Sequence, residues 1–417
     1  MSCGLHLKEL GIPFQIFEKE SRPGGLIRTE KSGEYQFDYG GHLLHFRGSD
    51  LEDSVKGLLG ENNLVRFKRR SFIYSNKVLT PYPFQVNTFG LPAEVIRDCL
   101  LGFFDTKLKA SRAKIDNFFE WILFHFGFGF AHHFFFPFNQ KFWRIPLTEL
   151  DTEWAEWSVP KPTLKDVIDG ALGINVQDFG YNIYFYYPKQ GGVEILAKSL
   201  AEKLGKIFLN REIISLNLNN RKFLLDNGEE IGYDKVISTM PLKELILKIK
   251  DAPEDLKKAG EGLRYISVLC VNLGIKGPMI SPAHWIYFPE DQFNFYRAGF
   301  YSNFTEKASE HQSVVLEITY LPDQEPLKDK DYLKQSLEDF RKTGLLKDEH
   351  LVEYTGVMKI PYAYIIFDRH RKSALPGILK FLEENGVYSI GRYGRWTYST
   401  IEDSIRDGRE TAKKIAR

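Results

Sequence analysis

Residues 2–18 limit what this chain can fold into more than any other stretch, because they combine a helix, a tight turn and a strand that ends in an acid. A helix is predicted over residues 2–11, and residues 14–18, FQIFE, are typical of a β-strand that ends at Glu18. In a dinucleotide-binding βαβ unit, an acid at this strand end holds a ribose hydroxyl. An apolar strand and a glycine-rich turn normally precede such a helix. The stretch is therefore either a nucleotide site whose phosphate loop is absent from the chain as given, or an ordinary strand that happens to end in an acid.

The charge balance and the cysteines exclude several classes of protein. The 417 residues include 56 Lys and Arg against 55 Asp and Glu, and the formal net charge of +1 gives no bulk field that would favour nucleic acid or an anionic membrane. Cys3, Cys99 and Cys270 are isolated, without the spacing of a disulfide framework or a metal site. We therefore expect a cytoplasmic protein that uses no metal and binds no nucleic acid.

One aromatic stretch approaches the composition of a membrane span. Residues 121–138, WILFHFGFGFAHHFFFPF, contain no Asp, Glu, Lys or Arg, and a span needs roughly 18 apolar residues. Three histidines, two glycines and a proline interrupt the stretch. We interpret it as an aromatic-rich helix pair that lines a core or a cleft, and membrane contact is not expected.

Hydrophobic periodicity divides the rest of the chain into helical and strand-rich parts. Residues 88–180 carry helical periodicity broken by prolines, which predicts an inserted helical domain. Later, short strands around Asn227 and Gly228 predict a hairpin. Residues 264–360 hold strand-like runs around one charged helix and are expected to form a second sheet. The chain closes with the strand GVYSIG, a glycine-rich turn and a helix from about Ile401.

Glycine-rich turns follow two predicted strands, and each lets a ligand approach the backbone closely. In FDYGGHLLHF, His42 comes directly after Gly40 and Gly41. This favours an imidazole at a ligand, although a buried core histidine fits the residues equally well. In SIGRYGRWTYST, free backbone N–H groups at a new helix would suit an anion or an electron-rich ring edge. A merely structural helix start is the alternative there.

Two further stretches suit a nucleotide. In TPYPFQVN, two prolines fix an extended backbone that would project the ring of Tyr82 and the amide of Gln85 towards a base, and an ordinary edge strand is the alternative. Arg297 lies among aromatic residues, where it would bind a ligand carboxylate or phosphate, or form a structural ion pair. No G-x-S-x-G motif, Cys/His pairing or close pair of acids indicates hydrolysis. The residues alone indicate a nucleotide-related cleft.

In chain order, these stretches resemble the UDP-galactopyranose mutases, particularly the eukaryotic type, and the wider flavin superfamily of amine oxidases and protoporphyrinogen oxidases. The resemblance implies an α/β fold with an FAD-binding doubly wound, Rossmann-like sheet, here lacking its first strand and G-x-G-x-x-G turn. It also implies an inserted helical domain and an antiparallel substrate sheet. The matching stretches are FEKESRPGGLIRT, FDYGGHLLHF, TPYPFQVN, PFNQKFWRIPLTEL, FYYPKQGG, VISTMP, HWIYFPEDQFNFYRAGFYSNF and GRYGRWTY.

The resemblance also divides the chain and bears on its start. Family members carry a strand and G-x-G-x-x-G immediately before the sequence that matches SCGLHLKELG. We therefore expect a truncated or misassigned start that lacks roughly fifteen to twenty residues, and impaired FAD affinity in the chain as given. The implied domains are three FAD-binding parts at residues 1–80, 186–245 and 361–417, a helical substrate domain at residues 81–185 and a substrate-binding sheet at residues 246–360.

The implied activity is an isomerisation on reduced FAD. In the family, N5 of the reduced flavin attacks the anomeric carbon of UDP-galactose, UDP leaves, and the flavin-bound sugar opens and recloses as a five-membered ring. There is no net redox change, and NAD(P)H would serve only to reduce the flavin.

The binding partner would be a nucleotide-sugar substrate used in cell-surface polysaccharide biosynthesis. Whether the chain forms a homo-oligomer is left open.

The resemblance assigns roles to individual residues. The catalytic residues would be His42, beside the isoalloxazine near N5, and Arg297, at the diphosphate. Glu18 would hold the adenosine ribose. The complete implied sets are Glu18, Gly24, Gly25, Arg28, Gly40, Gly41, Gly391, Arg392 and Asp403 for the cofactor, and Tyr82, Gln85, Tyr364 and Tyr398 for the substrate.

Two positions depart from the family pattern. Ser158 stands where members carry a second diphosphate-contacting arginine, and Phe304 replaces a phosphate-contacting tyrosine. The loss of one charge-assisted contact removes about 1.5–3 kcal/mol of binding free energy. A different sugar nucleotide therefore stays open, and so does an FAD-dependent oxidoreductase for an amine, porphyrinogen or polyprenoid substrate. An inactive or binding-only relative is the third alternative.

Overall fold

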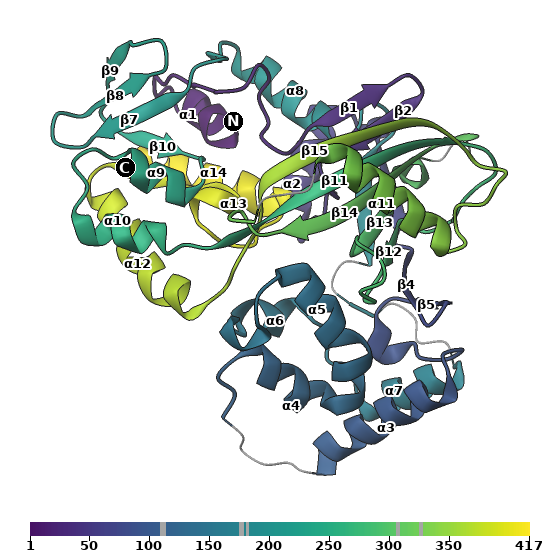
Figure 1. The fold of residues 1–417 in the computed structure, drawn as a ribbon. Helices are drawn as coiled ribbons and strands as arrows, with labels where there is room; N and C mark the ends of the chain where they lie inside the picture. Colours follow the sequence, from purple (N-terminus) through teal and green to yellow (C-terminus); the bar gives the residue numbers. More distant parts are fainter. Residues whose placement is uncertain (109–113, 175–178, 181–182, 306–308, 325–327) are drawn as a thin grey trace.

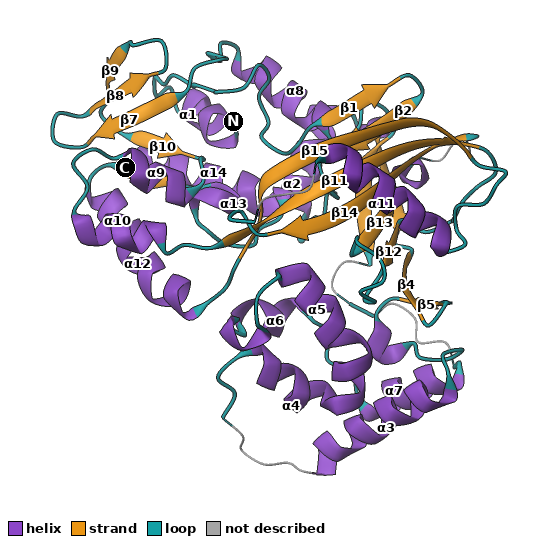
Figure 2. Cartoon of the chain, in the orientation of Figure 1, coloured by secondary structure: helices purple, strands orange, loops and turns teal. Residues whose placement is uncertain are grey.

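Helices from one continuous stretch of the chain form the lower part of the molecule, while the sheets and the two chain ends lie above them (Figure 1). Figure 2 shows the same division by secondary structure, with the strands confined to the upper part and its lower edge. In this computed structural model, all residues from 1 to 417 are described except 109–113, 175–178, 181–182, 306–308 and 325–327.

The first and last helices pack against each other. Helix α1 (Ser2–Glu9) lies on α14 (Ile401–Ile415), and Cys3, Leu7 and Ala412 share one apolar cluster between them. The predicted helix near the start is confirmed, and α14 begins at the predicted residue. Thr400 provides the N-cap of α14 and accepts a hydrogen bond from the N–H of the third helical residue.

Parallel pairing near the chain ends is limited to two short pieces. Strand β10 (Val236–Ser238) pairs in parallel with β16 (Val387–Ser389). The segment predicted as a strand over residues 14–18 makes one parallel bridge, between Phe17 and Phe208. Among the described residues, the two pieces belong to no common sheet. The FAD-binding sheet was expected to lack its first strand, and in the described residues its parallel pairing consists of one three-residue pair and a single bridge.

The largest sheet has seven strands in the order β15-β11-β14-β13-β12-β4-β5. It was expected to be antiparallel and to come from residues 246–360, but β4 and β5 come from before the helical stretch, and β4 pairs in parallel with β12. Strand β12 pairs antiparallel with β13 on one side and in parallel with the apolar β4 on the other. The sheet is therefore mixed. The strands are β4 (Ser71–Ser75), β5 (Val78–Pro81), β11 (Tyr265–Lys276), β12 (Trp285–Tyr287), β13 (Arg297–Phe300), β14 (His311–Tyr320) and β15 (Leu351–Ile365).

Strand β11 is apolar along its length because both faces of the sheet are covered. Its residues alternate between two clusters: Val268 packs with the cluster that contains Phe37, and Leu269 packs with the cluster that contains Phe340. Phe340 lies on α11 (Asp329–Lys342), the helix drawn in front of the sheet in Figure 1. Burial on both faces explains why this strand reads as a continuous hydrophobic run.

The aromatic stretch forms a buried helical run in the lower part. It comprises α4 (Phe118–Phe130), a π-helical turn (Ala131–Phe135) and α5 (Phe136–Trp143), and the expectation that it lines a core is confirmed because Trp121 and Phe126 are fully buried. Every helix in the described part of the chain is too short or too polar for a transmembrane span. The other elements here are α3 (Ala93–Leu108), α6 (Glu153–Ser158), α7 (Leu164–Leu172) and the 3₁₀ turns Phe84–Val86 and Leu147–Glu149.

Glycines bring the backbones of α3 and α4 into direct contact. A Cβ at Gly129 would lie 2.0 Å from the carbonyl oxygen of Asp98, and a Cβ at Gly127 would lie 2.0 Å from that of Gly102. Gly127 also has a φ of +74°, where the helix is kinked. This crossing therefore has no room for any side chain at Gly127 or Gly129.

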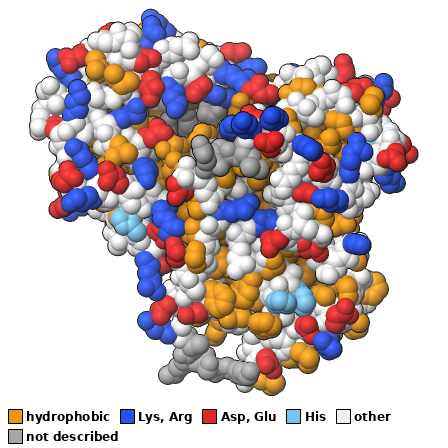
Figure 3. All heavy atoms as spheres, viewed as in Figure 1, with side chains coloured by type: hydrophobic (Ala, Val, Ile, Leu, Met, Phe, Trp, Pro, Cys, Tyr) orange, Lys and Arg blue, Asp and Glu red, His pale blue; other side chains and the backbone are white. Residues whose placement is uncertain are grey.

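Exposed apolar side chains are frequent on the helical part. Leu101 on α3 is 59% exposed and Phe128 on α4 is 65% exposed. Figure 3 shows orange side chains gathered over this lower part of the molecule, around pale blue histidine atoms.

The remaining elements surround the two chain ends and the large sheet. The hairpin predicted around Asn227 and Gly228 is confirmed, since β8 pairs antiparallel with β9 across it. These elements are β1 (Thr29–Ser32), β2 (Tyr35–Asp38), α2 (Ser49–Leu59), the 3₁₀ turn Glu61–Asn63, β3 (Leu64–Lys68), β6 (Tyr184–Pro188), α8 (Glu194–Leu204), β7 (Ile213–Asn217), β8 (Lys222–Leu225), β9 (Glu230–Gly232), α9 (Leu242–Lys248), α10 (Glu254–Glu261), the 3₁₀ turn Tyr301–Phe304, α12 (Arg369–Glu384) and α13 (Gly391–Gly394).

Candidate active site

Arg297 is anchored on the large sheet by a buried carboxylate. It lies on β13 directly opposite Glu317 on β14, and its terminal nitrogen donates to both carboxylate oxygens, at 2.7 and 2.9 Å. Glu317 is 1% exposed and also accepts a hydrogen bond from the hydroxyl of Tyr296. The structural ion pair considered from the sequence is therefore present. Arg297 Nε is buried and has no hydrogen-bond partner among the described atoms, so one donor remains for another group.

A second arginine lies among three tyrosines. The guanidinium of Arg392 lies 4.4 Å from the ring centre of Tyr398, 5.5 Å from that of Tyr364 and 5.9 Å from that of Tyr393. The backbone carbonyl of Ser399 accepts a hydrogen bond from Arg392 at 2.9 Å. Burial raises the pKa of Tyr364 to about 12, although Arg297 and Arg392 oppose the shift. The phenol of Tyr364 is thus a neutral hydrogen-bond donor between two cations at neutral pH.

His42 belongs to the same group. It follows the turn at Gly40, whose φ is +69°, and its backbone N–H donates to the Gly40 carbonyl at 2.9 Å. Burial, together with Arg392 and Arg297, lowers the pKa of His42 to about 4. Its Nδ1 is buried without a hydrogen-bond partner in the described part of the chain. A neutral imidazole with an unused nitrogen therefore faces two fixed positive charges.

Tyr82 approaches this group from the start of the helical part. Its ring lies 5.4 Å from the ring of Tyr287 and 5.0 Å from the guanidinium of Arg69. Burial raises the pKa of Tyr82 to about 12, although Arg69 opposes the shift, and the hydroxyls of Tyr287 and Tyr398 lie close enough to add to it. Gln85 is 2% exposed, and its amide donates to the Pro160 carbonyl at 2.8 Å. Gln85 therefore fixes the loop beside Tyr82 and has one amide hydrogen already in use.

The predicted cofactor residues near the start lie in turns around β1. Arg28 makes an ion pair with Glu20 at 3.6 Å, and its Nε is buried without a partner among the described atoms. Glu18 accepts a hydrogen bond from the Glu20 backbone N–H at 3.0 Å. Gly24 and Gly25 both have positive φ angles, of +121° and +59°.

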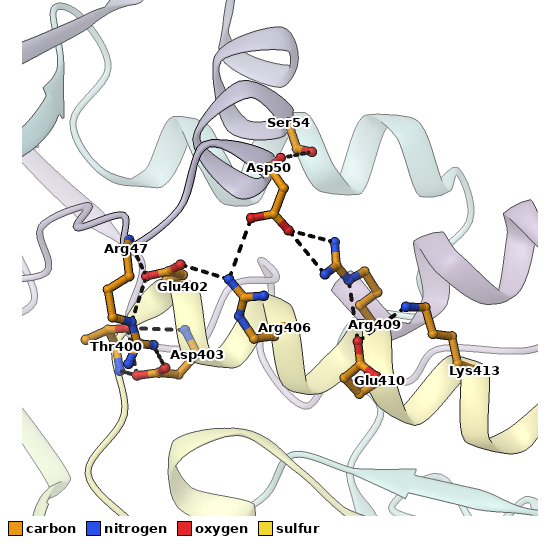
Figure 4. Close-up of polar contacts among 10 residues, drawn as sticks. All are labelled: Arg47, Asp50, Ser54, Thr400, Glu402, Asp403, Arg406, Arg409, Glu410 and Lys413. Carbon is orange, nitrogen blue, oxygen red and sulfur yellow. Dashed lines mark hydrogen bonds and ion pairs between the residues drawn. The ribbon is translucent and has the colours of Figure 1, made fainter.

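The start of α14 is fixed by ion pairs with the segment before α2 (Figure 4). Glu402 is 1% exposed and accepts hydrogen bonds from the Arg47 backbone N–H at 3.0 Å and from Arg406 at 3.1 Å. Asp403 accepts from the Thr400 backbone N–H at 2.8 Å and pairs with Arg47. The carboxylate of Asp403, predicted to face the cofactor, therefore caps the helix.

The two departures from the family pattern have clear structural positions. Ser158 lies in a hollow of about 410 Å³ that Trp157 and Lys161 also line, and its hydroxyl donates to the Trp154 carbonyl at 2.6 Å. The ring of Trp157 lies 5.4 Å from that of Tyr398, so the hollow adjoins the tyrosine and arginine group. Phe304 is 1% exposed and packs in the core beneath Trp285.

Sequence reasoning did not find Glu317, Arg69 or Tyr287. An acid inside the apolar run SVVLEITYL was the available signal for Glu317, because a buried charge needs a partner. Arg69 lies in the basic run at residues 68–70, which is typical of a solvent-exposed loop. The structure brings together His42, Tyr82, Arg297, Tyr364, Arg392 and Tyr398 through the contacts and electrostatic interactions given above.

The fold is that of a flavin-dependent enzyme. The chain belongs to the flavin containing amine oxidoreductase family, which matches residues 1–416. It is similar to a crystal structure of reduced UDP-galactopyranose mutase, with a TM-score of 0.93 and 26% identity over 99% of this chain and 91% of that chain. The family resemblance seen in the sequence is confirmed.

Two oxidases share the fold at lower identity. A crystal structure named as a putative protoporphyrinogen oxidase from Exiguobacterium sp. 255-15 has a TM-score of 0.75 and 15% identity over 100% of this chain and 96% of that chain. Wild-type putrescine oxidase bound to putrescine has a TM-score of 0.65 and 16% identity, with the same coverage of 100% and 96%.

The residues present fit the flavin that this family implies. His42 Nδ1, Arg28 Nε and Ser399 Oγ are buried and unpartnered among the described atoms, so each retains hydrogen-bonding capacity for a bound group. Gly25 and Gly391 have positive φ angles, and no atom lies within 4 Å of where a Cβ would stand. Their backbones are therefore open to close approach.

Proposed function

We propose that this chain is an FAD-dependent enzyme that interconverts the pyranose and furanose forms of a nucleotide sugar. The supporting observation is the similarity to UDP-galactopyranose mutase over 99% of the chain, together with two arginines and three tyrosines gathered beside His42. The proposal is more specific than the family, which includes oxidoreductases.

In this proposal, the side chains of the cluster hold and orient the substrate. Arg297 and Arg392 would balance the negative charge of a diphosphate that leaves and returns. Tyr364 and Tyr398 would donate hydrogen bonds to its oxygens, and Tyr82 would stack on the base. His42, Arg28, Gly25 and Gly391 would hold the flavin. Reduced flavin, when bound, supplies an electron-rich nitrogen for reaction at a sugar carbon without net redox change.

The test is direct conversion of UDP-galactofuranose. The protein is loaded with FAD, reduced with dithionite, and the products are separated by chromatography. We expect UDP-galactopyranose to form only after reduction. Arg392→Gln should abolish conversion, because it removes a cation that the neighbouring tyrosines cannot replace. The matched control is Arg70→Gln, an exposed arginine on the segment before β4 that donates to the Pro282 carbonyl. No conversion by reduced wild type whose flavin absorbance shows that FAD is bound would reject the proposal.

An FAD-dependent oxidoreductase is the second candidate, and the hollow at Ser158 favours it. The described residues that line this hollow supply one cation, Lys161, which is already paired with Glu156. An amine or a polyprenoid substrate carries no anionic group and would need no further cation there. Oxygen consumption by the oxidised, FAD-loaded protein with such a substrate, without dithionite, would support this candidate over the isomerase.

A further inference from the structure

A second hollow, of about 550 Å³, lies away from the tyrosine and arginine cluster. It is formed where the end of α5 meets β14 and α11, and its volume is within the range of small-molecule sites. Lys141 and Arg144 line it from the end of α5, and Thr319 lines it from β14. None of its lining residues belongs to the site described above.

The hollow contains two cations that are not paired with carboxylates. Lys141 is 6% exposed, and its ammonium donates to the backbone carbonyls of Phe288, at 2.9 Å, and Glu290. Arg144 Nε donates to Thr319 Oγ1 at 3.2 Å. Among the described residues, neither cation lies within ion-pair distance of an acid. A buried ammonium held only by neutral acceptors leaves a positive charge that an anion would stabilise.

The two cations are arranged for one ligand. Lys141 lies in the last turn of α5, Arg144 is the left-handed C-cap of that helix, and both residues line the hollow. Thr319 lies beside both residues, because its hydroxyl donates to the backbone carbonyl of Lys141 at 2.7 Å and accepts from Arg144 Nε. The guanidinium nitrogens of Arg144 beyond Nε have no partner among the described residues, and a guanidinium matches two phosphate oxygens at once.

The hollow is larger than a free phosphate ion needs, and several of its other lining residues are polar. Gln140, Gln335 and Tyr332 also line the hollow. Amide side chains donate and accept hydrogen bonds, as sugar hydroxyls require. Asp291 also lines the hollow and contributes the one carboxylate among its described lining residues. The lining therefore carries a net charge of +1 from two cations and one acid.

We propose that this hollow is a binding site for a small phosphate ester of the sugar phosphate class. Arg144 and Lys141 bind the phosphate, and the amides of Gln140 and Gln335 bind hydroxyls of the attached sugar. The site is independent of the function proposed above, because it shares no residue with that site.

The test measures binding of glucose 1-phosphate by calorimetry, with inorganic phosphate and glucose as separate probes. We expect the ester to bind more tightly than either probe. Arg144→Gln should weaken its binding by about tenfold or more, because it removes a charge-assisted contact from an exposed side chain. Asp291→Asn should strengthen binding by about two- to fivefold, because it removes the one repulsive charge in the described lining. Tyr398→Phe, in the other site, should leave the affinity unchanged.

The pH dependence provides a second readout. Burial lowers the pKa of Lys141 to about 8, although Asp291, Glu290 and Asp339 oppose the shift and Arg144 adds to it. Affinity for the ester should therefore fall as pH rises above about 8, where the ammonium loses its proton. Arg144→Gln should retain this pH dependence at lower affinity.

Each remaining outcome overturns the proposal or part of it. If Tyr398→Phe weakens binding and Arg144→Gln does not, the ester occupies the other site. Inorganic phosphate that binds as tightly as the ester would overturn the sugar phosphate assignment. No binding of the ester at millimolar concentration would overturn the site altogether.

Discussion

At the scale of single residues, the candidate active site is organised by one buried carboxylate. Glu317 binds both Arg297 and Tyr296, and Arg297 in turn lies close enough to His42 and Tyr364 to shift the pKa of each. The orientation of the arginine therefore depends on a residue on the neighbouring strand. This dependence makes Glu317 a positioning residue.

Glu317→Gln should lower the free energy of unfolding by about 3–5 kcal/mol, because it leaves the buried charge of Arg297 without a counterion. Urea unfolding followed by circular dichroism measures the change. The matched control is Glu310→Gln, whose carboxylate is 65% exposed and pairs with Lys276 at 3.6 Å, and it should change stability by less than about 1 kcal/mol. Replacing both Arg297 and Glu317 with Met should restore most of the loss. A double variant as unstable as Glu317→Gln would contradict this account.

His42 should make stability depend on pH in the acid range. Its pKa is lowered by burial to about 4, so the unfolded chain binds the proton more tightly than the folded chain. Keeping His42 neutral therefore adds about 3 kcal/mol to the free energy of unfolding above pH 6.5, relative to strongly acid pH. This stabilisation is lost as the pH falls towards 4. His42→Asn should remove this part of the slope when unfolding free energies at pH 7 and pH 4.5 are compared. An unchanged slope would show that His42 is accessible to protons in the folded state.

At the scale of elements, the crossing of α3 and α4 sets the geometry of the helical part. The two helices touch through the backbone at Gly102, Gly127 and Gly129, and the aromatic side chains of α4 then fill the space on either side. A helix made largely of phenylalanine can pack this closely only where it also contains glycine.

Gly129→Ala should destabilise the protein by about 3 kcal/mol or more, because the new methyl group would lie 2.0 Å from the Asp98 carbonyl oxygen. Gly57→Ala on α2 is the matched control. No atom lies within 4 Å of a Cβ at that position, and alanine should stabilise the helix by about 0.5–1 kcal/mol. Thermal unfolding of both variants checks the pair. Equal effects of the two variants would contradict the backbone contact.

Local sequence signals predicted the elements better than their pairing. The helix near the start, the helix from Ile401 and the hairpin at Gly228 were predictable because each carries its own cap, period or turn residue. The parallel pairing of β4 with β12 was not, because it joins residues more than two hundred positions apart. The role of Glu317 was not predictable for the same reason, because only the register of β13 with β14 places it opposite Arg297. Local signals singled out His42, Tyr82 and Arg297, whereas Arg392, Tyr364 and Tyr398 were anticipated only from the resemblance.

At the scale of the whole molecule, the two ends of the chain and the large sheet build the site together. His42 follows β2, Arg297 lies on β13, and Arg392 lies in α13 near the end of the chain. A ligand that binds all three would link segments separated by most of the sequence. Binding should therefore stabilise the fold as a unit.

FAD should raise the melting temperature in proportion to the logarithm of its concentration. A ligand that binds only the folded state adds about 2.7 kcal/mol at one hundred times its dissociation constant. Scanning calorimetry with increasing FAD measures the shift, and Arg28→Ala should reduce it because Arg28 Nε is one of the free buried donors. Lys31→Ala, at an exposed position on β1, is the control. A melting temperature that does not respond to FAD would contradict the assignment of these residues to the cofactor.

The protonation states of the cluster have a consequence for catalysis. His42 has a pKa of about 4, and Tyr82 and Tyr364 have pKa values of about 12, so all three keep the same charge throughout the physiological range. The two guanidiniums are permanently cationic. The total charge of these side chains therefore does not change with pH near neutrality, because none of them gains or loses a proton in that range. A turnover rate governed by them would be level from about pH 6 to pH 10, and any inflection inside that interval would belong to the reactants.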